Sequence, residues 1–168
     1  GMETILPGNT ASLDLFWNQN LRSQEKGRMF EERNSALYYK FVGSDVDHLS
    51  ESKDEQETIS LGLKWIGYKN QFFSSALIPD GKFNGALIRS GMNNDPAYLK
   101  NFHTETTVDY NPADNNGPGF RFYLGPNLYP LLHSYDKGVD DDKALDLDKL
   151  VPLGFKFFRW INTWIIIP

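Results

Sequence analysis

Alternating apolar and polar residues in the middle of the chain constrain its fold more than any other feature. Between Ile59 and Trp65 every second residue is apolar, which predicts a strand with one buried face. Residues 72–79 predict a second strand, and residues 83–89 predict its hairpin partner across the turn Pro79-Asp80-Gly81. Short strands so closely spaced indicate an antiparallel sheet.

Similar segments flank this region. Leu13, Leu15 and Trp17 alternate with polar residues, and residues 102–110 alternate in the same way. Further strands are predicted at residues 36–42, 46–49 and 120–124, and polar loops at 18–34 (with room for one helical turn), 50–57 and 111–119. Many short strands between turn signals predict a mainly β fold, an antiparallel β-sandwich.

After the last predicted strand the apolar period changes to that of a helix. Residues 127–135 predict a short amphipathic helix, with Asn127 as its N-cap and Pro130 in its first turn. Its apolar residues recur at helical spacing: Leu128, Leu131, Leu132 and Tyr135. An acidic connector at residues 136–149 follows, so the sandwich is expected to carry short α-helices at its C-terminal end.

The last stretch, residues 151–168, predicts an amphipathic helix of unusual composition. One face is aromatic and aliphatic, and a narrow polar stripe with two basic residues lies opposite. Lys156 and Arg159 interrupt the apolar run too early for a membrane-spanning helix, whereas a basic stripe opposite a Trp/Phe/Ile face suits a helix lying in the lipid headgroup layer. The candidate membrane-interface residues are Lys156, Phe157, Arg159, Trp160, Ile161, Trp164 and Ile165.

Two alternatives for the C-terminal stretch stay open. It could instead be an ordinary terminal helix that packs on the core. The interface interpretation divides the chain into a sandwich domain at residues 1–149 and an interfacial helix at residues 150–168. That helix would precede a transmembrane helix that this sequence does not include.

Composition excludes several classes of function. The net charge of −5 and pI near 5.1 argue against nucleic-acid binding, and the absence of cysteine excludes disulfides and thiolate metal sites. The histidines His48, His103 and His133 lack metal-ligand spacing. No motif for a cofactor is present, so neither cofactor nor catalysis is expected.

Three weaker candidates for chemistry remain. His103, Glu105 and Asp109 share one strand face and could form an acid–base group, although a solvated strand face has the same pattern. The loop 114–117 and the acidic stretch 140–142 offer calcium-type oxygen ligands without the spacing of an EF-hand loop. Aromatic residues make up 14% of the chain and could line a carbohydrate-binding face, but strand aromatics more often form a core.

Three segments together resemble the large periplasmic domain of YidC, the bacterial membrane protein insertase, in its Bacteroidetes form. The first is Trp65-Ile-Gly-Tyr-Lys-Asn-Gln-Phe-Phe-Ser-Ser-Ala-Leu-Ile-Pro79, similar to a strand pair of the family. The second is Phe122-Tyr-Leu-Gly-Pro126, similar to its aromatic-x-Gly-Pro corner before a short helix. The third is residues 145–164, with the core Arg159-Trp160-Ile161. The family's acid/Tyr-Gly-Trp start of the last helix reads Val-Pro-Leu-Gly at 151–154 here.

The resemblance implies a galactose-mutarotase-like β-supersandwich, of which this chain would be the C-terminal part. It implies a non-catalytic module on the periplasmic side of the inner membrane that positions an insertase for the insertion and folding of membrane proteins. Implied partners are the membrane surface, the Sec translocon components SecDF and SecYEG, and nascent membrane proteins. The alternative function is a carbohydrate-binding or sugar-modifying β-sandwich, and a third is a secreted scaffold with a packed terminal helix.

Overall fold

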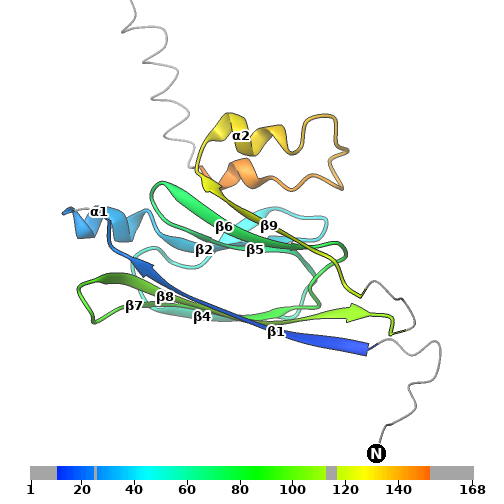
Figure 1. Ribbon diagram of the computed structural model, residues 1–168, viewed down its shortest axis with the longest axis horizontal. Coiled ribbons are helices and arrows are strands. Elements are labelled where there is room, and N and C mark those ends of the chain that lie inside the picture. Colours follow the sequence, from blue (N-terminus) through cyan, green and yellow to red (C-terminus); the bar gives the residue numbers. More distant parts are fainter. Residues whose placement is uncertain (1–10, 25, 113–116, 152–168) are drawn as a thin grey trace, which may run out of the picture.

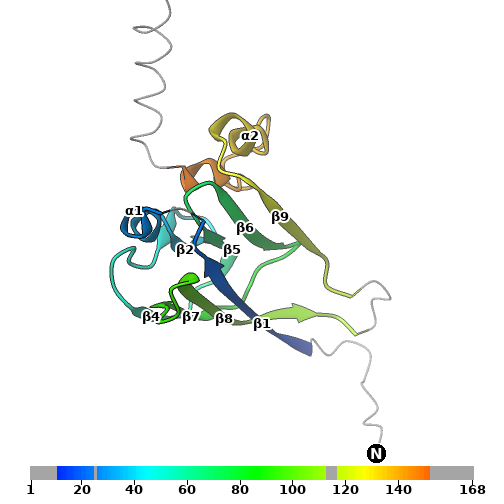
Figure 2. The same cartoon turned by 60° about the vertical axis from the view of Figure 1, so that its left-hand side comes forward.

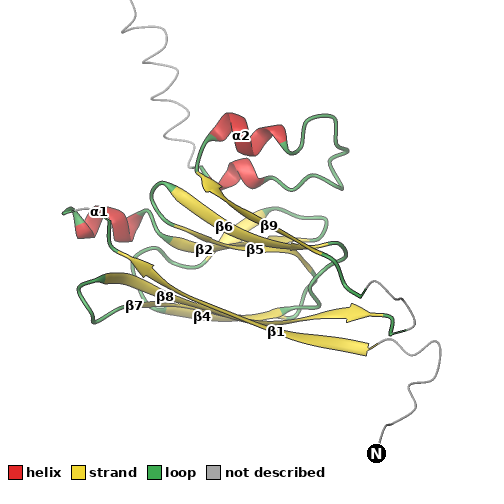
Figure 3. Cartoon of the chain, in the orientation of Figure 1, coloured by secondary structure: helices red, strands yellow, loops and turns green. Residues whose placement is uncertain are grey.

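Two antiparallel sheets face each other in this protein, and short helices cover the outer side of one of them (Figure 1, Figure 3). The structure is a computed structural model and describes residues 11–24, 26–112 and 117–151. It confirms the predicted mainly β antiparallel sandwich with short helices near the C-terminal end. Most of the predicted terminal helix lies outside the described residues, but its first two residues differ from the prediction, because Leu150 ends a 3-10 helix and Val151 has an extended backbone.

The first sheet has four strands in the order β1-β8-β7-β4. Their bounds are β1 (Ala11–Arg22), β4 (Glu55–Ile59), β7 (Ala86–Met92) and β8 (Tyr98–Tyr110). The long β8 pairs with β1 from Ala11↔Tyr110 to Arg22↔Tyr98. Its inward residues are buried as the alternation predicts: Phe102, Thr104, Thr106 and Val108.

The second sheet has five strands in the order β3-β2-β5-β6-β9. Their bounds are β2 (Ala36–Phe41), β3 (Val46–His48), β5 (Leu63–Lys69), β6 (Phe73–Pro79) and β9 (Phe120–Pro126). The strands predicted at residues 36–42 and 46–49 are confirmed as β2 and β3, and they pair as a hairpin with Tyr38 opposite His48. Both faces of β2 and β5 are buried, so this sheet forms the middle layer of the molecule.

The main core lies between the two sheets. Tyr68 of β5 stacks on Trp17 of β1 with ring centroids 3.8 Å apart, and its hydroxyl lies 2.9 Å from Thr104 Oγ1 of β8. Other buried members are Leu37, Tyr39, Leu63, Ile66, Phe83, Ile88, Leu99 and Phe102. One end of the sandwich carries α1 (Arg28–Arg33), the helical turn predicted within the 18–34 loop.

A second core lies on the outer side of the five-stranded sheet. It is covered by α2 (Tyr129–Ser134), the connector that follows, and the 3-10 helix η1 (Leu147–Leu150) (Figure 2). From the sheet come Ala36, Tyr38, Trp65, Ala76, Ile78 and Tyr123, and from the cover Leu132, Leu145, Leu147, Leu150 and Val151.

The single strand predicted between Ile59 and Trp65 is wrong. β4 ends at Ile59 in one sheet and β5 begins at Leu63 in the other. Leu61, between them, is 65% exposed. Leu63 and Trp65 also face different cores, because Phe41 pairs with Leu63 and Lys40 with Trp65, which leaves Lys64 as an extra residue. Such a bulge shifts the alternation by one residue.

The predicted hairpin of residues 72–79 with 83–89 is also wrong. β6 pairs with β5 and β9, whereas β7 pairs with β4 and β8 in the opposite sheet. The turn at Pro79-Asp80-Gly81 ends β6 as its composition predicts, but the chain then crosses between the sheets. Turn chemistry marks where a strand ends and does not specify which sheet the next strand joins.

Two predicted loops are shorter than expected. β1 continues to Arg22 and β4 begins at Glu55, although both segments are polar. Each is an edge strand, with one side open to water, so polar residues are compatible with pairing on the other.

Candidate functional site

The segment 127–151, called here the C-terminal cover, carries the chain from the end of β9 to the point where it leaves the described structure. It lies over the outer face of the five-stranded sheet and ends at the buried Val151. Because the predicted membrane-interface residues follow directly, the way in which this cover is fixed determines what they are attached to.

The cover begins at a corner that requires glycine. The hydroxyl of Tyr123 donates to the carbonyl of Pro126 at 2.7 Å, and a Cβ at Gly125 would lie only 2.7 Å from that hydroxyl oxygen. Asn127 then accepts a hydrogen bond from Ser74 Oγ and donates one to the carbonyl of Asn70. The motif Phe122-Tyr-Leu-Gly-Pro126 therefore sets the direction in which the chain leaves β9.

The predicted N-cap role of Asn127 is wrong. The N-cap of α2 is Leu128, without a side-chain hydrogen bond, and Pro130 lies in the first turn as predicted. The Asn127 side chain is committed to the turn between β5 and β6, so it ties the corner to the sheet instead of capping the helix.

Trp65 fixes the middle of the cover. Its side chain is fully buried, and its indole N–H donates to the carbonyl of Leu145 at 2.6 Å. On the cover itself, the Asp136 carboxylate accepts the backbone N–H groups of Leu145 and Asp146 at 2.6 and 2.7 Å. These contacts hold the connector in a single path across the sheet.

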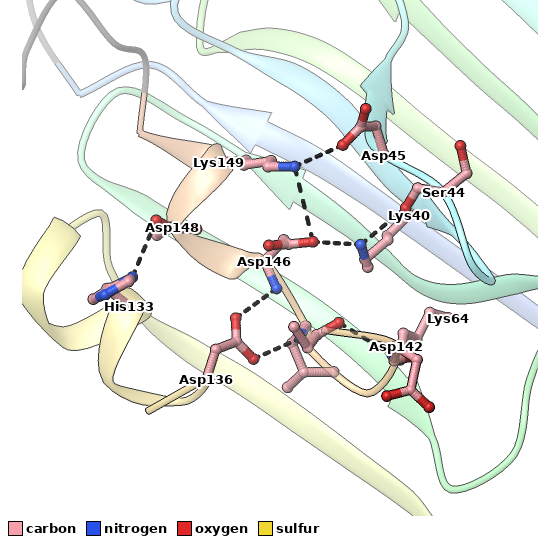
Figure 4. Close-up of polar contacts among 12 residues, drawn as sticks. Lys40, Ser44, Asp45, Lys64, His133, Asp136, Asp142, Asp146, Asp148 and Lys149 are labelled. Carbon is pink, nitrogen blue, oxygen red and sulfur yellow. Dashed lines mark hydrogen bonds and ion pairs between the residues drawn. The ribbon is translucent and has the colours of Figure 1, made fainter. Parts of the chain in front are cut away.

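A charged network joins the end of the cover to the β2–β3 hairpin (Figure 4). The buried Lys40 forms an ion pair with Asp146 and donates to the carbonyl of Ser44 at 2.9 Å. Lys149 forms an ion pair with Asp45 at 2.8 Å and lies 3.8 Å from Asp146. The Lys149–Asp45 hydrogen bond lowers the pKa of Asp45 and raises that of Lys149.

Two further contacts complete the network. Lys64 donates to the carbonyls of Asp142 and Ala144 at 2.7 and 3.1 Å, and burial lowers its pKa. Asp148 of η1 lies 3.4 Å from His133 of α2. Residues 136–149 were predicted only to be an acidic connector, but four of the connector's carboxylates have structural partners.

Where the cover ends, a groove of about 590 Å³ opens beside α1. Its apolar walls are Phe30, Phe72, Phe73, Leu128 and Val151. Lys69 and Gln71 also line it, and Lys69 Nζ and Gln71 Oε1 are buried without a hydrogen-bond partner among the described residues. Sequence patterns did not single out these two residues, because Lys69 ends β5 and is followed by Asn70 and Gln71, a polar run typical of a turn.

A second groove, of about 530 Å³, lies between the sheets at the edge formed by β1 and β9. Gln19 and Leu21 line it from one sheet, and Phe73, Leu124 and Gly125 from the other. Phe122 and Leu124 are 49% and 71% exposed. At this edge the sandwich is incompletely closed.

The predicted membrane-interface residues, from Lys156 to Ile165, lie outside the described residues. Of the predicted acid–base group, His103 and Glu105 lie together, with Nε2 and Oε1 2.7 Å apart, whereas Asp109 accepts a hydrogen bond from Asn84. The group is therefore split on a partly exposed strand face.

The described residues offer no cluster of metal ligands. Within residues 11–24, 26–112 and 117–151, no group of three or more His, Asp and Glu side chains could hold a metal ion. Asp140, in the candidate calcium stretch 140–142, pairs instead with Lys143, and the stretch 114–116 is not described. No helix in the described part of the chain is long and apolar enough to cross a membrane.

Comparison with known proteins identifies the family. The family model described as the YidC periplasmic domain matches residues 10–167. The chain is 45% identical over 168 residues to a Parabacteroides distasonis protein named membrane protein insertase YidC, covering all of this chain and 26% of that protein. Proteins of the same name from Azobacteroides pseudotrichonymphae and Porphyromonas gingivalis are 46% and 39% identical, each over 99% of this chain and 27% of their own length.

The matches agree with the resemblance stated from the three sequence segments and extend it over the first 57 residues, where no motif carried it. They support the insertase interpretation over the carbohydrate-binding one. The chain spans about a quarter of the length of these relatives. On this match, the chain belongs to the family of YidC periplasmic domains.

Proposed function

We propose that this chain is the C-terminal part of the periplasmic domain of a membrane protein insertase, and that it acts without catalysis to position the membrane-embedded part. The observation that carries the proposal is the fixed C-terminal cover. Trp65, Lys40 and Lys149 tie it to the sheet up to the buried Val151, and residues 152–168 continue from there with a Trp/Phe/Ile face and a basic stripe.

In this proposal the helix predicted at residues 150–168 lies at the periplasmic surface of the inner membrane and starts beyond Val151, whose backbone is extended. Lys156 and Arg159 face lipid headgroups, and Phe157, Trp160, Ile161, Trp164 and Ile165 enter the acyl boundary. A domain firmly attached to such a helix keeps a defined orientation over the membrane. Several apolar side chains exposed on the cover support this orientation: Leu128, Leu131, Tyr135 and Val139.

The sandwich is proposed to be one part of a β-supersandwich. The exposed Phe122 and Leu124 and the groove between β1 and β9 support this, because an open sheet edge with apolar side chains is normally covered. The completed domain would offer docking surfaces to Sec translocon components, SecDF and SecYEG, while nascent membrane proteins would engage the membrane-embedded part of the full-length protein.

Vesicle flotation tests the membrane contact. The full chain is compared with a chain ending at Val151, a position chosen because Leu150 and Val151 are buried and must be kept. We expect the full chain to float with vesicles of anionic phospholipid, with a blue shift of tryptophan fluorescence, and the shortened chain to stay in solution. Flotation of both, or of neither, contradicts the proposal.

Two matched double variants separate the electrostatic and apolar contributions of the helix to vesicle binding. Lys156→Gln with Arg159→Gln should weaken flotation on anionic vesicles and leave binding to zwitterionic vesicles unchanged. Trp160→Ser with Trp164→Ser should weaken binding to both kinds of vesicle, because the apolar contribution does not depend on headgroup charge. If neither double variant weakens flotation, the chain binds vesicles through some other surface.

A further inference from the structure

The groove at the end of the C-terminal cover combines apolar walls with one unused donor and one unused acceptor. Phe30, Phe72 and Leu128, all on its walls, are each about half exposed, at 55%, 47% and 53%. Lys69 Nζ and Gln71 Oε1 lack hydrogen-bond partners within the described chain. Buried polar groups in proteins are nearly always paired, so an occupant of this groove should supply both an acceptor and a donor.

Of the two unpaired atoms, Lys69 Nζ is the stronger indication that the groove has an occupant. The residue is 2% exposed, and its ammonium lies 5.3 Å from the centre of the Tyr38 ring. Burial lowers its pKa, and Glu51 opposes that effect only in part. A cation–π contact alone does not replace the hydrogen bonds that an ammonium group makes in water.

The described part of the chain ends at this groove. Val151 lines the groove and has extended backbone angles, φ −95° and ψ 112°, the conformation favoured before proline. If residues 152–155 continue extended, side chains alternate in direction, so Leu153 and Phe155 fall on the same face as Val151. The residues on the opposite face are then Pro152 and Gly154, which have little or nothing to bury.

We propose that the groove is the docking site of this chain's own residues 152–155. In an extended segment, a main-chain carbonyl accepts from Lys69 Nζ, a main-chain N–H donates to Gln71 Oε1, and Leu153 and Phe155 pack against Phe30, Phe72 and Leu128. At about 3.3 Å per residue, an extended segment places Phe155 roughly 13 Å from Val151. A peptide main chain is the simplest occupant that brings a donor, an acceptor and apolar side chains together.

This docking rests on the proposed positioning function and gives it a physical basis. A segment seated in the groove extends the fixed cover by four residues and removes a flexible tether between the sandwich and residues 156–168. The orientation of the domain over the membrane would then be set by the groove.

Engineered cysteine pairs test the docking directly, because the chain contains no cysteine of its own. Leu153→Cys is combined in turn with Phe30→Cys, Phe72→Cys and Leu128→Cys, and oxidised mildly in dilute solution without vesicles. The control combines Leu153→Cys with Leu61→Cys, an exposed position outside the groove. Since a disulfide needs Cβ atoms about 4 Å apart, we expect at least one groove pair to form an intramolecular disulfide at least ten times faster than the control.

Each other outcome overturns the proposal. Equal rates of disulfide formation for all four cysteine pairs mean that residue 153 does not lie in the groove. Disulfides that form only between two molecules mean that the occupant is a second copy. The assay contains no lipid, so it can fail while flotation succeeds, and flotation can fail while the disulfide forms, which keeps the two proposals distinguishable.

Hydrogen exchange gives an independent measurement on chains without cysteines. Residues 153–155 should exchange at least ten times more slowly than in a Leu153→Asp variant, which places a charge against the apolar walls. Equal exchange in the two chains contradicts the docking.

Discussion

Lys100 of β8 is a buried lysine whose role is structural. It is 1% exposed, and its ammonium donates to the carbonyls of Ser35 and Glu51 at 2.6 and 2.7 Å. It therefore joins the chain ahead of β2 and the loop after β3 to the opposite sheet. Burial lowers its pKa to about 8, more than the nearby carboxylates, Glu51 foremost, raise it.

This pKa predicts a specific pH dependence of stability. Lysine in the unfolded chain keeps its proton to about pH 10.4, so between pH 8 and that value the unfolded state binds more protons than the folded state. The free energy of unfolding should consequently rise with pH in this interval. Urea unfolding at pH 7.5 and 9.5 checks this: the rise should be larger for the natural chain than for Lys100→Met.

The same comparison carries its own controls. Lys137→Met removes an exposed lysine and should leave the slope unchanged. The buried tyrosines Tyr38, Tyr39 and Tyr68 have raised pKa values, so they lower stability only above about pH 10, beyond the interval used. Identical slopes for the natural chain and Lys100→Met contradict the prediction.

At the scale of elements, Asp146 connects the C-terminal cover to β2. It caps the start of η1 with a left-handed φ of 51°, and its carboxylate pairs with the buried Lys40. Asp146→Ala should lower the free energy of unfolding by about 2–4 kcal/mol, since it adds backbone strain and removes a charged hydrogen bond. Asp146→Gly, which removes the carboxylate without the strain, should cost less than Asp146→Ala.

Hydrogen exchange locates this effect. Residues 144–151 should exchange faster in Asp146→Ala than in the natural chain, with β8 unchanged. Asp141→Ala, at an exposed position of the same connector, should change stability by less than about 0.5 kcal/mol. A loss shared equally by the two variants would mean that the ion pair does not anchor the cover.

The helix α2 yields a second prediction at this scale. Leu132 is fully buried against the sheet, whereas Leu131 is 39% exposed. Leu132→Ala should therefore cost about 2–5 kcal/mol, and Leu131→Ala less than about 1 kcal/mol. Thermal or urea unfolding of the two variants distinguishes them, and equal losses would mean that α2 packs by a different face.

The same helix shows what the sequence could predict and what it could not. Periodicity identified the segment and its apolar residues, but of Leu128, Leu131, Leu132 and Tyr135 only Leu132 is buried. Alternation likewise located β8 and its buried face, yet failed between Ile59 and Trp65, where a bulge and a change of sheet intervene. Local pattern reports which residues are apolar, and tertiary contacts decide which of them are covered.

The candidate site was predicted to a still smaller extent. Composition singled out residues 156–165, which the structure does not describe, and missed Lys69 and Gln71. Those two residues are candidates because Lys69 Nζ and Gln71 Oε1 are buried without hydrogen-bond partners among the described residues. A sequence pattern cannot show this, because hydrogen-bond partners depend on which strands lie next to each other. Similarly, Lys40 and Asp146 are 106 residues apart in the chain, so nothing local could pair them.

At the scale of the whole molecule, a groove lies between the two sheets at one edge of the sandwich. β1 and β9 are both terminal strands of their sheets, and the groove between them leaves Leu124 71% exposed. The opposite edge is better closed: Leu49, which follows β3, is only 1% exposed. The asymmetry fits a sandwich of which a further part covers one edge.

Without that further part, the open edge should promote association between copies, because unpaired strand edges with apolar side chains pair readily. We expect concentration-dependent self-association of the chain ending at Val151, measured by sedimentation velocity. Leu124→Lys should raise the apparent dissociation constant at least tenfold and change the free energy of unfolding by less than about 0.5 kcal/mol. Leu61→Lys, at an equally exposed apolar residue away from this edge, should leave association unchanged. A chain that stays monomeric at the highest attainable concentration would show that the edge needs no cover, and the larger sandwich would then lose its structural support.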